Sequence, residues 1–160
     1  MIKTYGSQRR DDRLITYGTS RAVLIYGFGT EGGSSFDFRH TFDHIPTCQE
    51  VVDVLTDHID EVTRERILSG CVYDDCRVWL SAENQANYMA AFTLASASPD
   101  TLPYTVKMES LSDGSDVFRE FTTLSELGDF VRFFRQHIDS AQAAGWREKL
   151  SVKEASWLPG

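Results

Sequence analysis

The stretches AVLIYGFGTEGG, residues 22–33, and SSFDFRHTF, residues 34–42, decide how this chain begins to fold. The first stretch opens with an apolar run typical of a buried strand, followed by Gly27, Gly29 and Gly32 in the order G-x-G-x-x-G. In dinucleotide-binding proteins a helix follows these glycines, because its N-terminus receives the pyrophosphate. Here residues 34–42 alternate between apolar and polar with period two, which predicts a second strand. We therefore expect a hairpin with a long loop, in which the glycines serve the turn.

Two further patterns weigh against a nucleotide site. Asp53, about twenty residues after the glycines as a ribose-binding acid would be, falls inside a predicted helix. The chain also lacks the V-A-I-K, H-R-D and D-F-G motifs that accompany a glycine-rich hairpin in protein kinases. We expect no cofactor.

Composition places the chain among globular proteins. It has 160 residues, of which 41% are hydrophobic and 12% aromatic, so it can bury a core. Its formal net charge of −8 disfavours nucleic acid as a partner, because a phosphate backbone repels it. The sequence has no run of about 18 apolar residues and no apolar signal segment, so we expect no membrane contact and synthesis in the cytoplasm.

The spacing of apolar residues predicts three helices, over residues 47–70, 81–98 and 123–145. Thr47 with Glu50, and Thr123 with Glu126, have the T-x-x-E spacing of a capping box, in which each side chain accepts from the backbone of the other residue. Ser81 is placed to cap the middle helix. These signals fix where each helix begins.

Glycines and turn residues predict where the helices end and where strands lie. Gly70 and Gly145 are expected to end the first and last helices. Residues 71–80 read as a hairpin with Asp74 and Asp75 at the turn, and residues 102–122 read as a second hairpin. The predicted fold class is α+β, with three main helices packed on short antiparallel hairpins. We expect an N-terminal arm or edge element over residues 1–20, one domain over 21–150 and a tail over 151–160.

Histidine and cysteine spacings offer no strong metal or redox site. His40 and His44 would lie roughly 13 Å apart in a strand, too far to share an ion. In the hairpin, Cys71 would face Val78 and Cys76 would face Tyr73, so the two sulfurs would be diagonal neighbours, roughly 7–8 Å apart, and would form no disulfide. We expect no metal and no catalytic residues.

Cys48 supports one chemical alternative. It lies in the first turn of a predicted helix, where the helix dipole would lower the pKa of its thiol and make it nucleophilic. A small cysteine-dependent hydrolase is therefore retained as a less favoured hypothesis.

The order of the segments RILSGCVYDDCRVWLSAENQANYMAAFTLA, LPYTVKM and FREFTTLSELGDFVRFFRQHIDSAQAAGWREK resembles a known domain. This uncharacterised domain recurs in tail-associated and other virion proteins of tailed phages and prophages, especially those of gut Bacteroides-like hosts. The resemblance covers roughly residues 36–149 and includes Val78-Trp79-Leu80 and Gly145-Trp146. Residues 1–35 have no counterpart in the family pattern.

The resemblance implies a small helix–hairpin–helix–hairpin–helix domain used for assembly, often joined to fibre or tail parts. We therefore expect a non-enzymatic virion structural protein of the tail, neck or fibre-attachment region, synthesised in the bacterial host. Its expected partners are other virion proteins and further copies of itself. An intracellular chaperone for tail-fibre assembly is the alternative.

Five residues are candidates for contacts with such partners: Trp157, Trp146, Tyr5, Arg9 and Arg10. An assembly protein leaves aromatic surface available after its own core is filled. Trp157 either anchors the tail to its own domain or docks into a neighbour. The segment around Tyr5, Arg9 and Arg10 is able to add a strand to an adjacent subunit.

Overall fold

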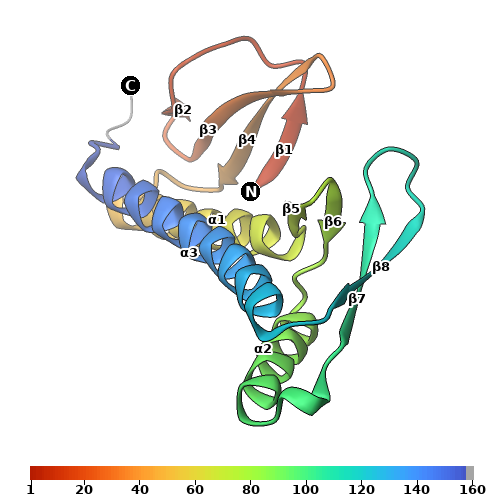
Figure 1. Cartoon of the computed structure of the whole chain (residues 1–160). Helices are drawn as coiled ribbons and strands as arrows, with labels where there is room; N and C mark the ends of the chain where they lie inside the picture. The colour runs from red at the N-terminus through yellow and green to blue at the C-terminus, as the bar shows by residue number, and fades with distance from the viewer. Residues whose placement is uncertain (158–160) are drawn as a thin grey trace. The chain divides into compact units, whose positions relative to one another are not determined.

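The fold of the chain is α+β, as the sequence predicts. The computed structural model describes residues 1–157 (Figure 1). Its elements are, in chain order, β1 (Ile2–Tyr5), β2 (Arg13–Tyr17), β3 (Arg21–Glu31), β4 (Ser34–Phe42), α1 (Cys48–Leu68), β5 (Cys71–Tyr73), β6 (Cys76–Val78), α2 (Ala82–Ala97), a 3-10 turn (Pro99–Thr101), β7 (Tyr104–Ser110), β8 (Asp116–Phe121) and α3 (Leu124–Glu154).

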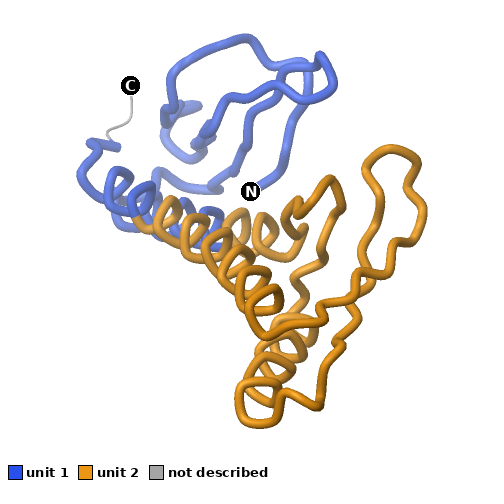
Figure 2. The backbone as a smooth tube through the Cα atoms, in the orientation of Figure 1, with its two compact units in different colours: residues 1–60, 147–160 blue, residues 61–146 orange. Residues whose placement is uncertain are grey.

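The chain divides into two compact units, whereas the sequence led us to expect one domain over residues 21–150. Unit 1 holds residues 1–60 and 147–160, and unit 2 holds residues 61–146 (Figure 2). Each unit has its own four-stranded sheet and its own cluster of buried side chains. Chain length bounds the total core but does not say how apolar residues divide between two cores.

Unit 1 is built on an antiparallel sheet with the strand order β1-β4-β3-β2. The first twenty residues, expected to form an arm or edge element, supply both edge strands of this sheet. The segment between these strands is tied down as well: the Gly6 N–H donates to the Ser35 carbonyl over 2.8 Å, and the Gly27 N–H donates to the Asp12 carboxylate over 2.7 Å. These contacts make the N-terminal segment part of the sheet.

The glycines of the G-x-G-x-x-G pattern have three separate structural roles. β3 continues through Gly27 and Gly29 to Glu31, so the strand is longer than the apolar run predicts. Gly27 has a φ of 67° at an irregularity in the pairing, and Gly29 lies so close to the Phe36 ring that a Cβ would be 2.5 Å from it. Only Gly32, with its neighbour Gly33, forms the turn, which has two residues instead of the expected long loop.

The segment after these glycines is extended. β4 pairs with β3 from Ala22↔Phe42 to Glu31↔Ser34. A helix N-terminus is therefore absent where a dinucleotide site would need one.

The core of unit 1 brings the sheet together with the first part of α1 and the end of α3. α1 contributes Val51, Leu55 and Ile59, which are almost fully buried. Trp157 and Val152 are buried in the same cluster. The predicted tail covers residues 151–160. Its described part is helical as far as Glu154 and then packs into the core through Trp157, whereas residues 158–160 lie outside the described residues.

Unit 2 is built on a second antiparallel sheet, with the order β5-β6-β7-β8. The β5–β6 register pairs Cys71 with Val78 and Tyr73 with Cys76, as predicted. Asp74 and Asp75 both have positive φ, 47° and 59°, as a tight two-residue hairpin turn requires.

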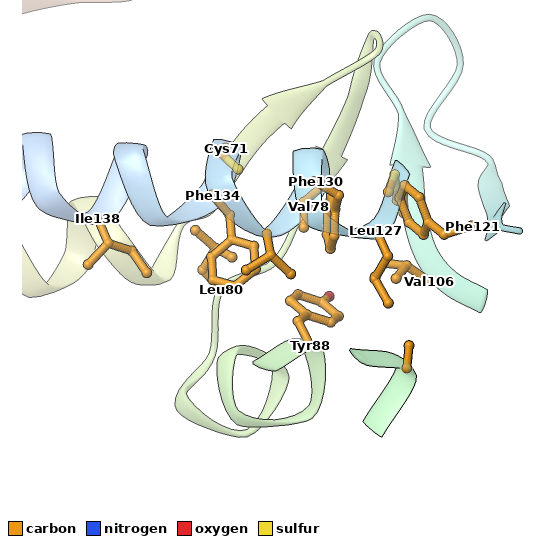
Figure 3. Close-up of a cluster of buried hydrophobic side chains, with 13 residues drawn as sticks. Cys71, Val78, Leu80, Tyr88, Val106, Phe121, Leu127, Phe130, Phe134 and Ile138 are labelled. Carbon is orange, nitrogen blue, oxygen red and sulfur yellow. The ribbon is translucent and has the colours of Figure 1, made fainter. Parts of the chain in front are cut away.

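The core of unit 2 is rich in aromatic rings that α3 supplies at helical spacing (Figure 3). The Phe130 ring stacks on Phe121 of β8 at 4.8 Å and meets Tyr88 of α2 edge-to-face at 5.2 Å. Burial raises the pKa of Tyr88 to about 12. These contacts join α2, α3 and β8 around one cluster.

The predicted helix starts are confirmed by their hydrogen bonds. The Thr47 N–H donates to the Glu50 carboxylate over 2.8 Å, and the same reciprocal arrangement joins Thr123 to Glu126. The Asn84 N–H donates to the Ser81 hydroxyl over 3.1 Å. Local side-chain chemistry therefore sets all three starts.

The predicted end of the last helix is wrong, because Gly145 lies inside α3. A Cβ at Gly145 would be 2.5 Å from Oγ1 of Thr63 on α1. The glycine thus permits a close approach of two helices, a role that has the same sequence signature as a helix end. Gly70 does follow the end of α1, with a φ of 88°.

Within residues 1–157, none of the helices combines the length and apolar character needed to cross a membrane.

Candidate functional site

The outward side of α2 is the largest departure from what its sequence pattern predicts. The helix has sixteen residues, and Glu83 is the one charged residue among them. Only Tyr88 and Ala95 are buried. Met89 is 40% exposed, and Leu94 is 59% exposed. The helix therefore carries little charge and exposes two large apolar side chains, a composition that suits a protein contact.

The exposed side of α2 continues into a shallow cavity of about 290 Å³. Its lining comes from the helix, the 3-10 turn and the start of β7: Asn87, Ala90, Ala91, Leu94, Thr101, Leu102 and Tyr104. These residues include no charged side chain. We call these residues the α2 surface.

Trp146 is the predicted interface residue that the structure leaves most open. It lies on α3, and 67% of its surface is exposed. Its neighbour Gly145 faces Thr63 of α1. An exposed indole of this size is typical of interface cores, and Trp146 remains a candidate.

Tyr5 and Arg10 are engaged within their own unit. The Tyr5 hydroxyl donates to the Glu31 carboxylate over 2.8 Å, although 56% of the residue is exposed. Arg10 pairs with Asp37 over 2.9 Å. Arg9 is exposed.

Asp37 of β4 is the buried carboxylate with which Arg10 of the N-terminal segment pairs. Its side chain is fully buried and accepts hydrogen bonds from Arg39 as well as Arg10. Burial alone would raise the pKa of this carboxyl, but the hydrogen bonds from Arg39 and Arg10 outweigh that effect and lower it. Nothing in the period-two pattern of β4 distinguishes Asp37 from an exposed acid.

Trp157 is buried, so of the two roles considered for it the structure shows an anchor within its own unit. Only 7% of its surface is exposed, and its indole N–H donates to the Val152 carbonyl over 2.9 Å. Its ring meets Tyr26 edge-to-face at 6.5 Å. Burying the indole removes a large apolar surface from water, which explains why a short segment after α3 is held in place.

Cys48, the candidate nucleophile, begins α1 and is exposed. Its thiol donates to the Trp157 carbonyl oxygen at a distance of 3.6 Å. Activation of a thiol requires a group that accepts its proton, and a peptide carbonyl is not such a base. This contact favours a structural role.

The other reactive residue types lie apart from one another. Cys71 is buried, which raises the pKa of its thiol to about 11, and Cys76 is half-buried. His44 contacts Asp43 and Glu50, which raise the pKa of its ring, whereas burial lowers that of His40. Over residues 1–157, no three His, Cys, Asp or Glu side chains gather closely enough to hold a metal ion.

The α2 surface is the feature that sequence reasoning missed. The available signal was the composition AENQANYMAAFTLASA, which has one charge in sixteen residues and no clear helical stripe. A scan against protein-family models and searches of curated proteins and of solved structures found no match.

Proposed function

We propose that this chain is a non-enzymatic structural protein of a tailed-phage particle, in the tail, neck or fibre-attachment region. It acts by contacts with other virion proteins and with copies of itself. The resemblance of residues 36–149 to a recurring virion domain supports this assignment.

The observation that carries the proposal is the α2 surface. A protein of net charge −8 repels its own copies and other acidic proteins. Contacts therefore form best where charge is scarce, and Glu83 is the one charge on this sixteen-residue helix. Leu94, which is 59% exposed, adds apolar area there. Burial of such a surface is the main driving force of protein association.

The roles of the acidic side chains also support a framework protein. Glu50 and Glu126 serve capping boxes, and Asp37 is held by two arginines. These three carboxylates stabilise the fold.

Mass spectrometry of purified particles tests the assignment. We expect the chain at a fixed ratio to the tail or neck proteins of the phage or prophage that encodes it, after washing at high salt. If the chain is found with fibre proteins in the infected cell but is absent from particles, the chaperone alternative replaces our proposal.

The role of the α2 surface is tested with Leu94→Glu. We expect this variant to fold but to enter particles at least tenfold less than the unmodified chain, because it places a charge on the α2 surface. Leu111→Glu is the matched control, since Leu111 is 47% exposed and lies in the turn after β7. Equal incorporation of both variants would exclude α2 as the contact.

A further inference from the structure

Unit 1 contains an open groove with a volume of about 630 Å³. One wall is the segment that leads into and along β2, and the other is the end of α3 with the residues after it. The lining residues are Asp12, Arg13, Leu14, Ile15, Tyr26, Ser151, Val152, Ala155, Ser156 and Trp157. We call this the β2 groove.

The β2 wall is a sheet edge. β2 is the last strand in the order β1-β4-β3-β2 and pairs with β3 from Arg13↔Ile25 to Tyr17↔Arg21. An edge strand presents backbone N–H and C=O groups on the side away from its partner, and an extended peptide is able to pair with them. The five residues of β2 span about 17 Å, enough for a short added strand.

The floor of the groove is apolar and rigid. Leu14, Val152 and Trp157 are each at least nine-tenths buried. The Trp157 indole already donates to the Val152 carbonyl, and the Tyr26 hydroxyl donates to Glu148 over 2.7 Å. Because the polar atoms of these rings have partners, the floor is suited to an apolar side chain and needs no rearrangement to receive one.

One end of the groove carries negative charge. The Asp12 carboxylate accepts from the Gly27 N–H, and burial together with the nearby charges of Asp11 and Glu148 raises its pKa. Arg13 is the cation in the lining, but its side chain lies on the opposite face of β2 from Leu14, because side chains alternate along a strand. A cation from outside would complement Asp12 better than a neutral or acidic group.

The spacing of Asp12 and Leu14 along the chain relates the negative end of the groove to its apolar floor. Asp12 and Leu14 are two residues apart, and both line the groove. An added strand would meet them with two of its own residues that are also two apart. The matching motif is apolar-x-basic in an antiparallel strand and basic-x-apolar in a parallel one.

We propose that the β2 groove binds an extended peptide segment by strand addition to β2, with an aliphatic side chain over Leu14 and Trp157 and a lysine or arginine beside Asp12. This goes beyond the proposed function, because it names a second surface and the chemistry of its partner. It does not depend on the location of the chain in a particle.

Fluorescence anisotropy with labelled peptides on the whole chain tests the proposal. The two probes are TVTLTKT, for antiparallel addition, and TKTLTVT, for parallel addition. Controls replace lysine by glutamate, or replace the threonine between leucine and lysine by proline, which cannot donate to a sheet. We expect saturable binding of one orientation, and binding of its glutamate and proline versions that is at least tenfold weaker.

Two variants locate the peptide. Ala155→Trp fills the groove from an exposed position and should reduce the affinity more than tenfold, whereas Ala97→Trp, exposed at the end of α2, should leave it unchanged. Asp12→Asn keeps an acceptor for the Gly27 N–H and should reduce the preference for lysine over glutamate at least threefold.

The proposal is overturned if neither probe shows saturable binding up to millimolar peptide, or if peptide binds but Asp12→Asn and Ala155→Trp both leave the affinities unchanged. Should Ala155→Trp fail to fold by circular dichroism, Asp12→Asn alone decides the outcome. Absence of the chain from particles would refute the proposed function and leave these titrations unaffected.

Discussion

The contact between Gly145 and Thr63 gives a prediction in which the sign of a mutation reverses. Gly145→Ala has two opposing effects. Alanine stabilises a helix interior by about 1 kcal/mol relative to glycine. Its Cβ, however, would lie 2.5 Å from Oγ1 and 3.4 Å from Cγ2 of Thr63. The distance to Oγ1 is a clash, and a β-branched side chain in a helix has few rotamers with which to avoid it.

The expected change in the free energy of unfolding follows from these two effects. Overpacking costs about 1–3 kcal/mol, so Gly145→Ala should lower the free energy of unfolding by about 1 kcal/mol. In a Thr63→Ala background the clash is removed, while alanine still favours the helix more than glycine does. Gly145→Ala should then raise the free energy of unfolding by about 1 kcal/mol. The coupling free energy between the two positions is therefore about 2 kcal/mol.

Urea unfolding of the unmodified chain, both single variants and the double variant measures this coupling. Far-ultraviolet circular dichroism follows the helices, and the four midpoints at a common slope give the cycle. Because the cycle subtracts each single effect, helix propensity at Thr63 does not contribute. A coupling below about 0.5 kcal/mol would refute the close approach of α1 and α3 at Gly145.

Three further predictions concern other positions. Gly70→Ala should lower the free energy of unfolding by at least 2 kcal/mol more than Gly114→Ala in urea titrations. Both glycines have positive φ, but a Cβ at Gly70 would lie 2.0 Å from the Val78 carbonyl oxygen, whereas a Cβ at Gly114 would have nothing within 4 Å. Equal losses in the two variants would contradict this. Asp37→Asn should lower the free energy of unfolding by about 2–3 kcal/mol at pH 7. Because the folded pKa of Asp37 is lowered, the stability that its carboxylate contributes is present above the unfolded pKa, near 4, and disappears as the pH falls through the folded pKa. The difference in stability between the variant and the unmodified chain, measured by urea unfolding, should therefore shrink below about pH 4. At pH 8 the exposed Cys48 should react with a thiol reagent at least tenfold faster than Cys71, because burial raises the pKa of the Cys71 thiol to about 11. Peptide mass mapping over time measures both rates. Comparable rates would mean that Cys71 is not buried.

Features with local causes could be predicted from the sequence. Examples are the capping boxes at Thr47 and Thr123 and the hairpin register around Asp74 and Asp75, which depend on residues within seven positions of one another. The extended conformation of residues 34–42 follows from their own alternation. Such signals act before any long-range contact forms.

Features that depend on distant partners could not be predicted. Gly145 has the same local signature whether it ends a helix or admits a side chain from another one, and only Thr63 decides between them. Trp157 is buried because Tyr26 and Val152 receive it, although its neighbours in sequence are those of a weak tail. Of the interface candidates, Trp146, Tyr5 and Arg9 are exposed, whereas Trp157 is buried. The α2 surface was missed because exposure is set by what packs against a helix.

The turn between β5 and β6 leaves room to make this protein more stable. Asp74 and Asp75 both hold left-handed backbone angles, which cost a residue with a side chain about 1 kcal/mol each relative to glycine. Arg119 lies 3.1 Å from the Asp74 carboxylate, whereas no comparable ion pair is described for Asp75 in residues 1–157. Asp75→Gly should therefore raise the melting temperature by a few degrees. With two acids at this hairpin tip, the chain is less stable than it would be with glycine at position 75. The tip is therefore a position at which an engineered version should gain stability.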